Sequence, residues 1–147
     1  MESAVTLCSD RPPALFPANV ERAVLRPDFE SEAYFGSGWR DAERTPTGRV
    51  RRAGNRATLL LPLPTGSSYQ ISLDLVTASS HVEAALNGAI VGVCELGDRR
   101  TSCDVTVPSA IVRDGVNALT LTAAPLSSSE APMLTFQGAR ILRLRDR

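Results

Sequence analysis

The sequence predicts an all-β protein built as a sandwich of two antiparallel sheets. Roughly eight or nine short apolar segments follow one another, several alternate apolar with polar residues, and turn residues separate them at fairly regular intervals. A period of two is typical of strands with one buried face, and regularly spaced short strands are typical of sandwiches. The chain of 147 residues has the usual length of one domain and is long enough to bury a core.

The elements can be assigned in chain order. The proline-rich residues 1–20 predict an extended arm, and residues 21–147 then form the single domain. A short helix is expected around Asn19–Leu25, and Pro108–Gly115 should form one helical turn or a wide loop. The predicted strands are Arg49–Ala53, Arg56–Leu63, Tyr69–Leu75, Val82–Leu86, Ala89–Leu96, Cys103–Val107, Leu119–Leu121, Met133–Phe136 and Ala139–Leu144.

Turn chemistry and alternation give two finer expectations. Asn87–Gly88 should form a tight hairpin turn in which Gly88 has positive φ, because two-residue hairpin turns need that conformation. Apolar residues at alternate positions should face one core between the two sheets. The residues expected there are Tyr69, Ile71, Leu73, Leu75, Val82, Ala84, Leu86, Val105, Leu119 and Leu121.

The composition and charge of the sequence argue against several classes of function. The formal net charge is zero, from 16 basic and 16 acidic residues, and this balance argues against a nucleic-acid partner. No apolar run approaches the roughly 18 residues of a membrane-spanning helix, so membrane insertion is not expected. The N-terminus lacks the pattern of a signal peptide, which makes a cytoplasmic protein the default expectation. The basic residues are all arginine, which favours a GC-rich bacterial source, and nothing in the sequence fixes an oligomeric state.

The three cysteines are Cys8, Cys94 and Cys103, and their spacing matches no zinc-binding pattern. Cys94 and Cys103 flank a predicted hairpin turn at Gly97–Asp98, so a disulfide between them is one alternative. Free cysteine packs as a small apolar residue, and two buried thiols are the favoured interpretation.

Several motifs are more specific than alternation. Within His81–Leu121, a strand ends in Asn87–Gly88, the next begins with Val91–Gly92, and a later strand is entered through Gly115–Leu119. The pair Gly38–Trp39 precedes the first long strand. These motifs resemble the galactose-binding-like jelly rolls, which include sugar-binding domains attached to bacterial glycoside hydrolases and glycosyltransferases.

The resemblance covers about residues 28–145, up to a closing strand over Gly138–Leu144. It implies the jelly-roll form of the two-sheet sandwich and an accessory role beside a glycan-processing enzyme. Arg52 stands where many members carry an aromatic residue after the arginine that matches Arg51. The shared motifs are mostly turn and strand-entry residues, so they indicate the fold rather than a particular sugar.

The candidate ligand-binding residues are Tyr34, Trp39, Arg40 and Glu43. Sugar sites stack a ring on an aromatic side chain and hydrogen-bond the hydroxyls, and this loop combines aromatics, glycines and charge. Trp39 would be the stacking platform, with Arg40 and Glu43 as hydrogen-bonding groups. In the alternative, which is favoured, Trp39 and Phe35 plug one end of the core, since large aromatic residues are usually buried.

Other candidate chemistry is weaker. His81 is the sole histidine and is expected to be a polar residue at a strand end. Asp74 and Glu83 look like solvent-side members of alternating strands rather than the paired carboxyls of a glycosidase, so no catalytic residue is assigned. No metal or cofactor is expected, with calcium on loop oxygens as the alternative. The arginines between Arg40 and Arg56 are expected to form a solvated face, with recognition of an anionic sugar, a phosphate or an acidic partner as the alternative.

Two functional hypotheses remain. The leading one is a non-catalytic carbohydrate-binding or accessory module associated with glycan-processing machinery. The second is a protein-interaction or structural sandwich with no small-molecule ligand.

Overall fold

The computed structural model describes residues 14–16, 21–27, 29–46, 48–77, 81–95, 102–123 and 134–144. Most of this part is strand, with two short 3-10 helices. The elements are β1 (Arg22–Leu25), η1 (Phe29–Tyr34), β2 (Glu43–Thr45), β3 (Gly48–Ala53), β4 (Arg56–Pro62), β5 (Ser68–Thr77), β6 (His81–Leu86), β7 (Ala89–Glu95), β8 (Ser102–Val107), η2 (Ser109–Ile111), β9 (Val116–Ala123) and β10 (Leu134–Leu144).

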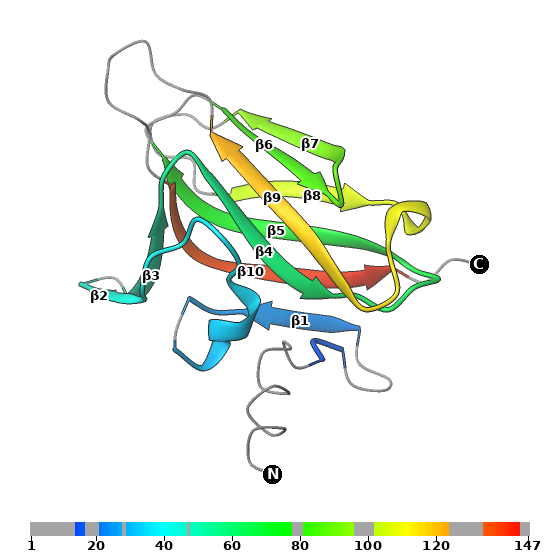
Figure 1. The fold of residues 1–147 in the computed structure, drawn as a ribbon, viewed down its shortest axis with the longest axis horizontal. Helices are drawn as coiled ribbons and strands as arrows, with labels where there is room; N and C mark the ends of the chain where they lie inside the picture. Colours follow the sequence, from blue (N-terminus) through cyan, green and yellow to red (C-terminus); the bar gives the residue numbers. More distant parts are fainter. Residues whose placement is uncertain are drawn as a thin grey trace.

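The strands form two antiparallel sheets that pack face to face (Figure 1). The six-stranded sheet has the order β2-β3-β10-β5-β8, and β1 pairs with β10 outside this path. The four-stranded sheet has the order β4-β9-β6-β7. The two-sheet antiparallel sandwich predicted from the sequence is confirmed, and no helix interrupts the described residues between Arg56 and Val107.

The core lies between the two sheets and is formed by alternate residues of most strands. All the residues predicted to face it are buried, and Tyr69, Ile71, Leu73 and Leu75 on β5 are fully enclosed. Burying a side chain of this size contributes about 1.5–3 kcal/mol, so a continuous apolar core is the main source of stability. Phe16 adds to it, with its ring centroid 5.5 Å from that of Tyr69.

The helix expected around Asn19–Leu25 is a wrong prediction, because Arg22–Leu25 is strand β1. Four residues of β1 pair with β10, from Arg22 opposite Leu142 to Leu25 opposite Ala139. Backbone pairing with an existing sheet outweighs a weak local helix preference. The last two predicted strands are one element, β10, which carries a bulge between Phe136 and Gly138.

The predicted hairpin turn between β6 and β7 is confirmed. Asn87 has φ of 52° and Gly88 has φ of 90°, so both central residues are left-handed, as a type I′ turn requires. The loop predicted over Pro108–Gly115 contains the single helical turn η2, and it leads directly into β9.

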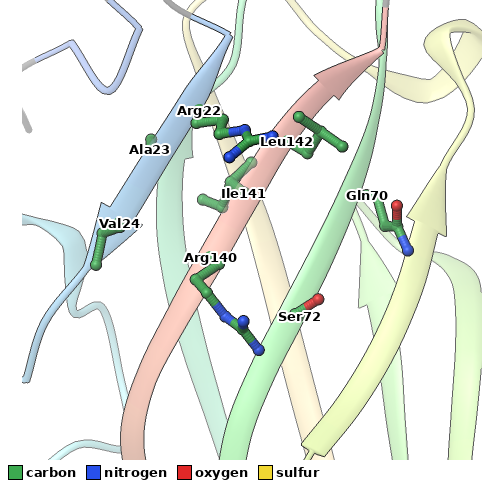
Figure 2. Close-up of a pocket in the computed structure, with 8 residues that line it drawn as sticks. All are labelled: Arg22, Ala23, Val24, Gln70, Ser72, Arg140, Ile141 and Leu142. Carbon is green, nitrogen blue, oxygen red and sulfur yellow. The ribbon is translucent and has the colours of Figure 1, made fainter.

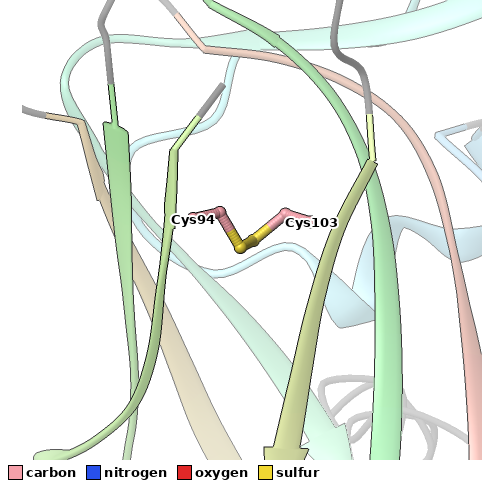
Figure 3. The surroundings of a disulfide bond; sticks show 2 residues. All are labelled: Cys94 and Cys103. Carbon is pink, nitrogen blue, oxygen red and sulfur yellow. A yellow bond between two sulfur atoms is a disulfide. The ribbon is translucent and has the colours of Figure 1, made fainter. Parts of the chain in front are cut away.

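Cys94 and Cys103 form a disulfide, with their Cα atoms 5.5 Å apart, so the expectation of two thiols is wrong (Figure 3). The expected hairpin between them is also wrong, because β7 is the last strand of the four-stranded sheet and β8 the last strand of the six-stranded sheet. The chain therefore crosses from one sheet to the other here. The disulfide joins the two sheets along this edge, and the turn predicted at Gly97–Asp98 lies outside the described residues.

Candidate functional site

The segment Tyr34–Arg40 closes the opposite edge of the sandwich, and we call it the strap. Its first half runs along β4, where the Gly36 amide donates to the Thr58 carbonyl over 2.8 Å and Phe35 bridges to Leu59. Its second half reaches β3, where Trp39 bridges to Ala53. The strap therefore connects the outer strand of the four-stranded sheet to β3 of the six-stranded sheet.

Two glycines let the strap approach β4 closely. A Cβ atom on Gly38 would lie 2.4 Å from the Arg56 carbonyl oxygen, and one on Gly36 would lie 3.1 Å from the Thr58 carbonyl oxygen. Gly38 also has φ of 93°, which side chains disfavour. These glycines thus serve packing of the strap, and they need no role in a flexible binding loop.

Trp39 is half-buried at the core edge. Its indole nitrogen donates to the Thr58 carbonyl over 2.8 Å, and its ring makes edge contacts with Phe35 and Phe136 at centroid distances of 5.4 and 5.6 Å. These contacts match the core-plug alternative, while the exposed part of the indole leaves a surface on which a sugar ring can stack. The role of Trp39 as a platform stays a prediction.

Tyr34 is 7% exposed, and burial raises the pKa of its phenol. Beside it, Arg51 is also buried: its guanidinium lies 4.3 Å from the Phe35 ring centroid and donates to Glu32 Oε1 over 2.5 Å. The same side chain donates to the Arg40 carbonyl over 3.3 Å. The sequence predicts that Arg51 belongs to a solvated arginine face. For this residue the prediction is wrong, because Arg51 is buried and donates to a backbone carbonyl of the strap.

Arg40 and Glu43 reach the surface. Glu43 faces Arg52 on β3, with 3.2 Å between the carboxylate and the guanidinium Nε. An exposed pair of this kind contributes little to stability and leaves both groups accessible. Of the four residues predicted to bind ligand, Trp39, Arg40 and Glu43 are thus at least partly accessible, whereas Tyr34 lies mostly in the core.

A hollow of about 350 Å³ lies on the outer face of the six-stranded sheet, across β1, β10 and β5 (Figure 2). Its lining combines hydrogen-bonding side chains with apolar ones. The lining residues are Arg22, Ala23, Val24, Gln70, Ser72, Arg140, Ile141 and Leu142. Arg140 lies opposite Ser72 on β5 and opposite Val24 on β1, so the side chains of this row share the outer face.

A second hollow, of about 250 Å³, lies further along the same face. It is lined by Thr45, Val50, Arg52, Val76, Thr135 and Gln137. β10 supplies residues to both hollows, Arg140 to the first and Gln137 to the second. The outer face along β10 and β5 therefore offers two depressions with polar and apolar groups in each.

Sequence reasoning missed this face. Gln70 and Ser72 carried a signal, because they are the polar members of an alternating strand. Arg22 and Val24 carried none, since they were assigned to a helix.

The other candidate residues from the sequence do not come together in one site. Asp74 and Glu83 are half-buried on the outer faces of different sheets, so these two carboxyls do not flank one substrate. His81 is the exposed first residue of β6, as predicted. In the part of the chain that the structure describes, no three His, Cys, Asp or Glu side chains gather to hold a metal ion.

No protein-family model matches the chain, and no curated protein matches it. Solved structures do. The C-terminal CBM6 module of LamC, a marine laminarinase from Zobellia galactanivorans, is 17% identical and aligns over 82% of this chain and 98% of its own, with a TM-score of 0.53. The chain therefore shares the two-sheet antiparallel β-sandwich fold of this module.

Two further solved structures resemble this chain over most of its length. The CBM36-1 domain of a multidomain xylanase from the hindgut metagenome of Trinervitermes trinervoides is 11% identical over 82% of this chain and 95% of its own, with a TM-score of 0.50. The mosquito-larvicidal Cry4Aa toxin from Bacillus thuringiensis is 10% identical over 91% of this chain and 25% of its own, with a TM-score of 0.55. At these identities the likeness establishes the fold alone.

Proposed function

We propose that this chain is a non-catalytic carbohydrate-binding module that holds a glycan on the outer face of its six-stranded sheet. The observation that carries the proposal is the pair of hollows along β10 and β5, in which Gln70, Ser72 and Arg140 stand beside Val24 and Leu142. The modules of a laminarinase and a xylanase with the same fold support a carbohydrate as the ligand class.

The lining suits a saccharide for two reasons. Gln70 donates and accepts hydrogen bonds, the Ser72 hydroxyl does the same, and Arg140 donates, which matches the mixed donors and acceptors of sugar hydroxyls. Val24 and Leu142 supply apolar surface for the C–H face of a sugar ring. The side chains stand on paired strands, so the face is largely preformed and little ordering entropy is lost on binding.

The strap is the second place proposed to contact the glycan, through Trp39, Arg40 and Glu43. It lies along the sandwich edge formed by β3 and β4, where the half-exposed indole is held by the Thr58 carbonyl. A rigidly held aromatic ring is a suitable platform, because its position is fixed before the ligand arrives.

A protein-interaction role is the second candidate function, and one observation favours it. Ile90 and Val93 on β7 are 64% and 54% exposed, on the last strand of the four-stranded sheet. A terminal strand with exposed apolar side chains is a template for pairing with another chain. The larvicidal toxin shows that the fold also occurs outside carbohydrate-binding modules.

We also propose that the module works outside the reducing cytoplasm, because the Cys94–Cys103 disulfide needs an oxidising environment to persist. Among the described residues, no helix has the length and apolar character to cross a membrane. No catalytic role is proposed.

Affinity electrophoresis and a glycan array test the proposal, with laminarin, xylan and acidic polysaccharides in the gels. Binding to at least one glycan is expected. Ser72→Leu should fill the first hollow and abolish binding there, whereas Thr122→Leu, on the outer face of the other sheet, should not. In the same assays, the Trp39→Phe variant tests whether the strap contributes to glycan binding. Failure to bind any glycan on the array, by a chain shown to be folded, would overturn the proposal.

A further inference from the structure

We propose that the first hollow recognises an acidic saccharide, whose carboxylate or sulfate is held between Arg22 and Arg140. The inference rests on the proposed carbohydrate binding and gives its ligand class. It is carried by the placement of two arginines in one hollow that has no acidic residue in its lining.

The two arginines stand on neighbouring strands of one face. Arg22 lies opposite Leu142 and Val24 lies opposite Arg140, so the arginines are diagonal neighbours across β1 and β10. Diagonal neighbours in a sheet are about 7–8 Å apart, within reach of long side chains. Figure 2 shows the Arg22 side chain extending from β1 toward β10 and the Arg140 side chain extending toward Ser72 on β5. An anion between them can accept hydrogen bonds from both.

The protein itself neutralises this charge only weakly. Arg140 has Asp74 as its ion-pair partner, at 4.0 Å and with the arginine side chain 65% exposed. Within the described residues, Arg22 has no carboxylate at ion-pair distance. Two like charges on adjacent strands repel, and a bound anion relieves that repulsion.

Positive and negative side chains lie on different strands around the first hollow. Around the first hollow, the cations Arg22 and Arg140 stand on β1 and β10, whereas the acidic side chains Asp74 and Asp104 stand on β5 and β8. Gln70 and Ser72 lie between the two sides. A saccharide would therefore bind with its anionic group over β1 and β10 and its neutral hydroxyls over β5.

Arginine is suited to this task because its planar guanidinium forms paired hydrogen bonds with carboxylate and sulfate oxygens. Val24, which is 58% exposed, and Leu142 add apolar contact with the sugar ring. An acidic saccharide therefore gains both the charged and the apolar contacts, whereas a free inorganic anion gains only the charged contacts.

Isothermal titration calorimetry at low salt tests the inference with three probes: oligogalacturonides, sulfated galactan oligosaccharides and neutral galacto-oligosaccharides. We expect at least one acidic probe to bind about tenfold more tightly than the neutral one, as charged hydrogen bonds imply. Arg22→Gln and Arg140→Gln should each remove about tenfold of the affinity for the acidic probe and lower the affinity for the neutral probe by much less. The carboxylate and sulfate arms identify which anion is preferred.

Arg56→Gln is the matched control, since Arg56 is an exposed arginine at the start of β4 in the other sheet. It should not change affinity for any probe, and thermal melts should show all three variants folded. Equal affinity for acidic and neutral probes, or arginine variants that bind acidic probes as the wild type does, would overturn this inference and leave carbohydrate binding standing. Absence of binding to every saccharide would overturn both.

Discussion

The side-chain amides of Asn87 and Asn117 are hydrogen-bonded to each other, with Nδ2 of Asn87 donating to Oδ1 of Asn117 over 2.8 Å. Asn117 is fully buried and also donates to the carbonyls of Leu61 and Arg113 at 3.3 and 3.0 Å. The Asn87 side chain accepts from the Ala118 amide over 3.0 Å. The two asparagines therefore tie the loop before β9 to the β6–β7 turn, which gives both motif residues a structural role.

Asn117→Ala should destabilise the protein by about 2–4 kcal/mol, because several buried polar groups lose their partner at once. Guanidinium unfolding measures this cost. Asn55→Ala is the control, since Asn55 is exposed in the β3–β4 turn and its hydrogen bond to the Ala123 amide uses the backbone carbonyl. Equal effects of the two substitutions would contradict a structural role for Asn117.

Gly88→Val should cost on the order of 1 kcal/mol or more, because a β-branched residue is strained at φ of 90°. Gly54→Val controls for the added side chain: a Cβ on either glycine meets nothing within 4 Å, but Gly54 does not have positive φ. The difference between the two melting temperatures isolates backbone strain. Variants with the same melting temperature would argue against the turn.

Reducing the Cys94–Cys103 disulfide should lower stability by about 2–3 kcal/mol, the value that loop-closure entropy gives for a short loop. Alkylation before and after reduction, read by mass spectrometry, should show that two thiols become reactive only after reduction. Working in a Cys8→Ser background removes the third thiol. Immediate labelling of Cys94 and Cys103 in protein from an oxidising host would contradict the bond.

Trp39→Ala should destabilise the domain by about 3–5 kcal/mol, because the indole packs on Phe35 and Phe136 and donates to Thr58. Trp39→Phe keeps much of the packing and should cost clearly less. Urea unfolding of both variants measures the two values. A Trp39→Ala protein as stable as the wild type would make stacking on ligand the remaining role for this side chain.

The two tyrosines should ionise late. Burial raises the pKa of both Tyr34 and Tyr69 above the ordinary value of 10.0, although Arg143 lowers that of Tyr69 in part. The neutral phenol is therefore favoured by the fold, and its contribution to stability is complete below pH 10 and is lost as the pH rises through the higher folded pKa. Absorbance titration at alkaline pH, native against denaturant-unfolded, should show the native curve displaced upward. Superimposed curves would contradict the burial of both rings.

The strands that sequence reasoning found are those that alternate over several residues, such as β5 and β8, because one face of each is buried. Short edge strands gave no such pattern. β1 and β2 exist because β10 and β3 offer backbone partners, and that pairing is set by the whole fold.

The candidate site was harder to predict for a related reason. The first hollow combines side chains from β1, β5 and β10, and a chain read in order does not show which strands become neighbours. Arg51 shows a second limit, because a run of arginines suggests a solvated face while the fold encloses one member behind Phe35. The disulfide stayed the less favoured alternative because free cysteine packs as a small apolar residue, and the sequence does not show that β7 and β8 bring the two thiols together from different sheets.

The pairing of β1 with β10 makes the first and last strands of the fold direct neighbours, with Arg22 opposite Leu142. A short flexible linker can therefore join the ends of these strands without crossing either sheet. New ends opened in the exposed Thr65–Gly66 turn would give a circularly permuted chain with the same strand neighbours. In that chain β1 and β10 would form a local hairpin that supplies most of the lining of the first hollow, and only Gln70 and Ser72 would come from β5.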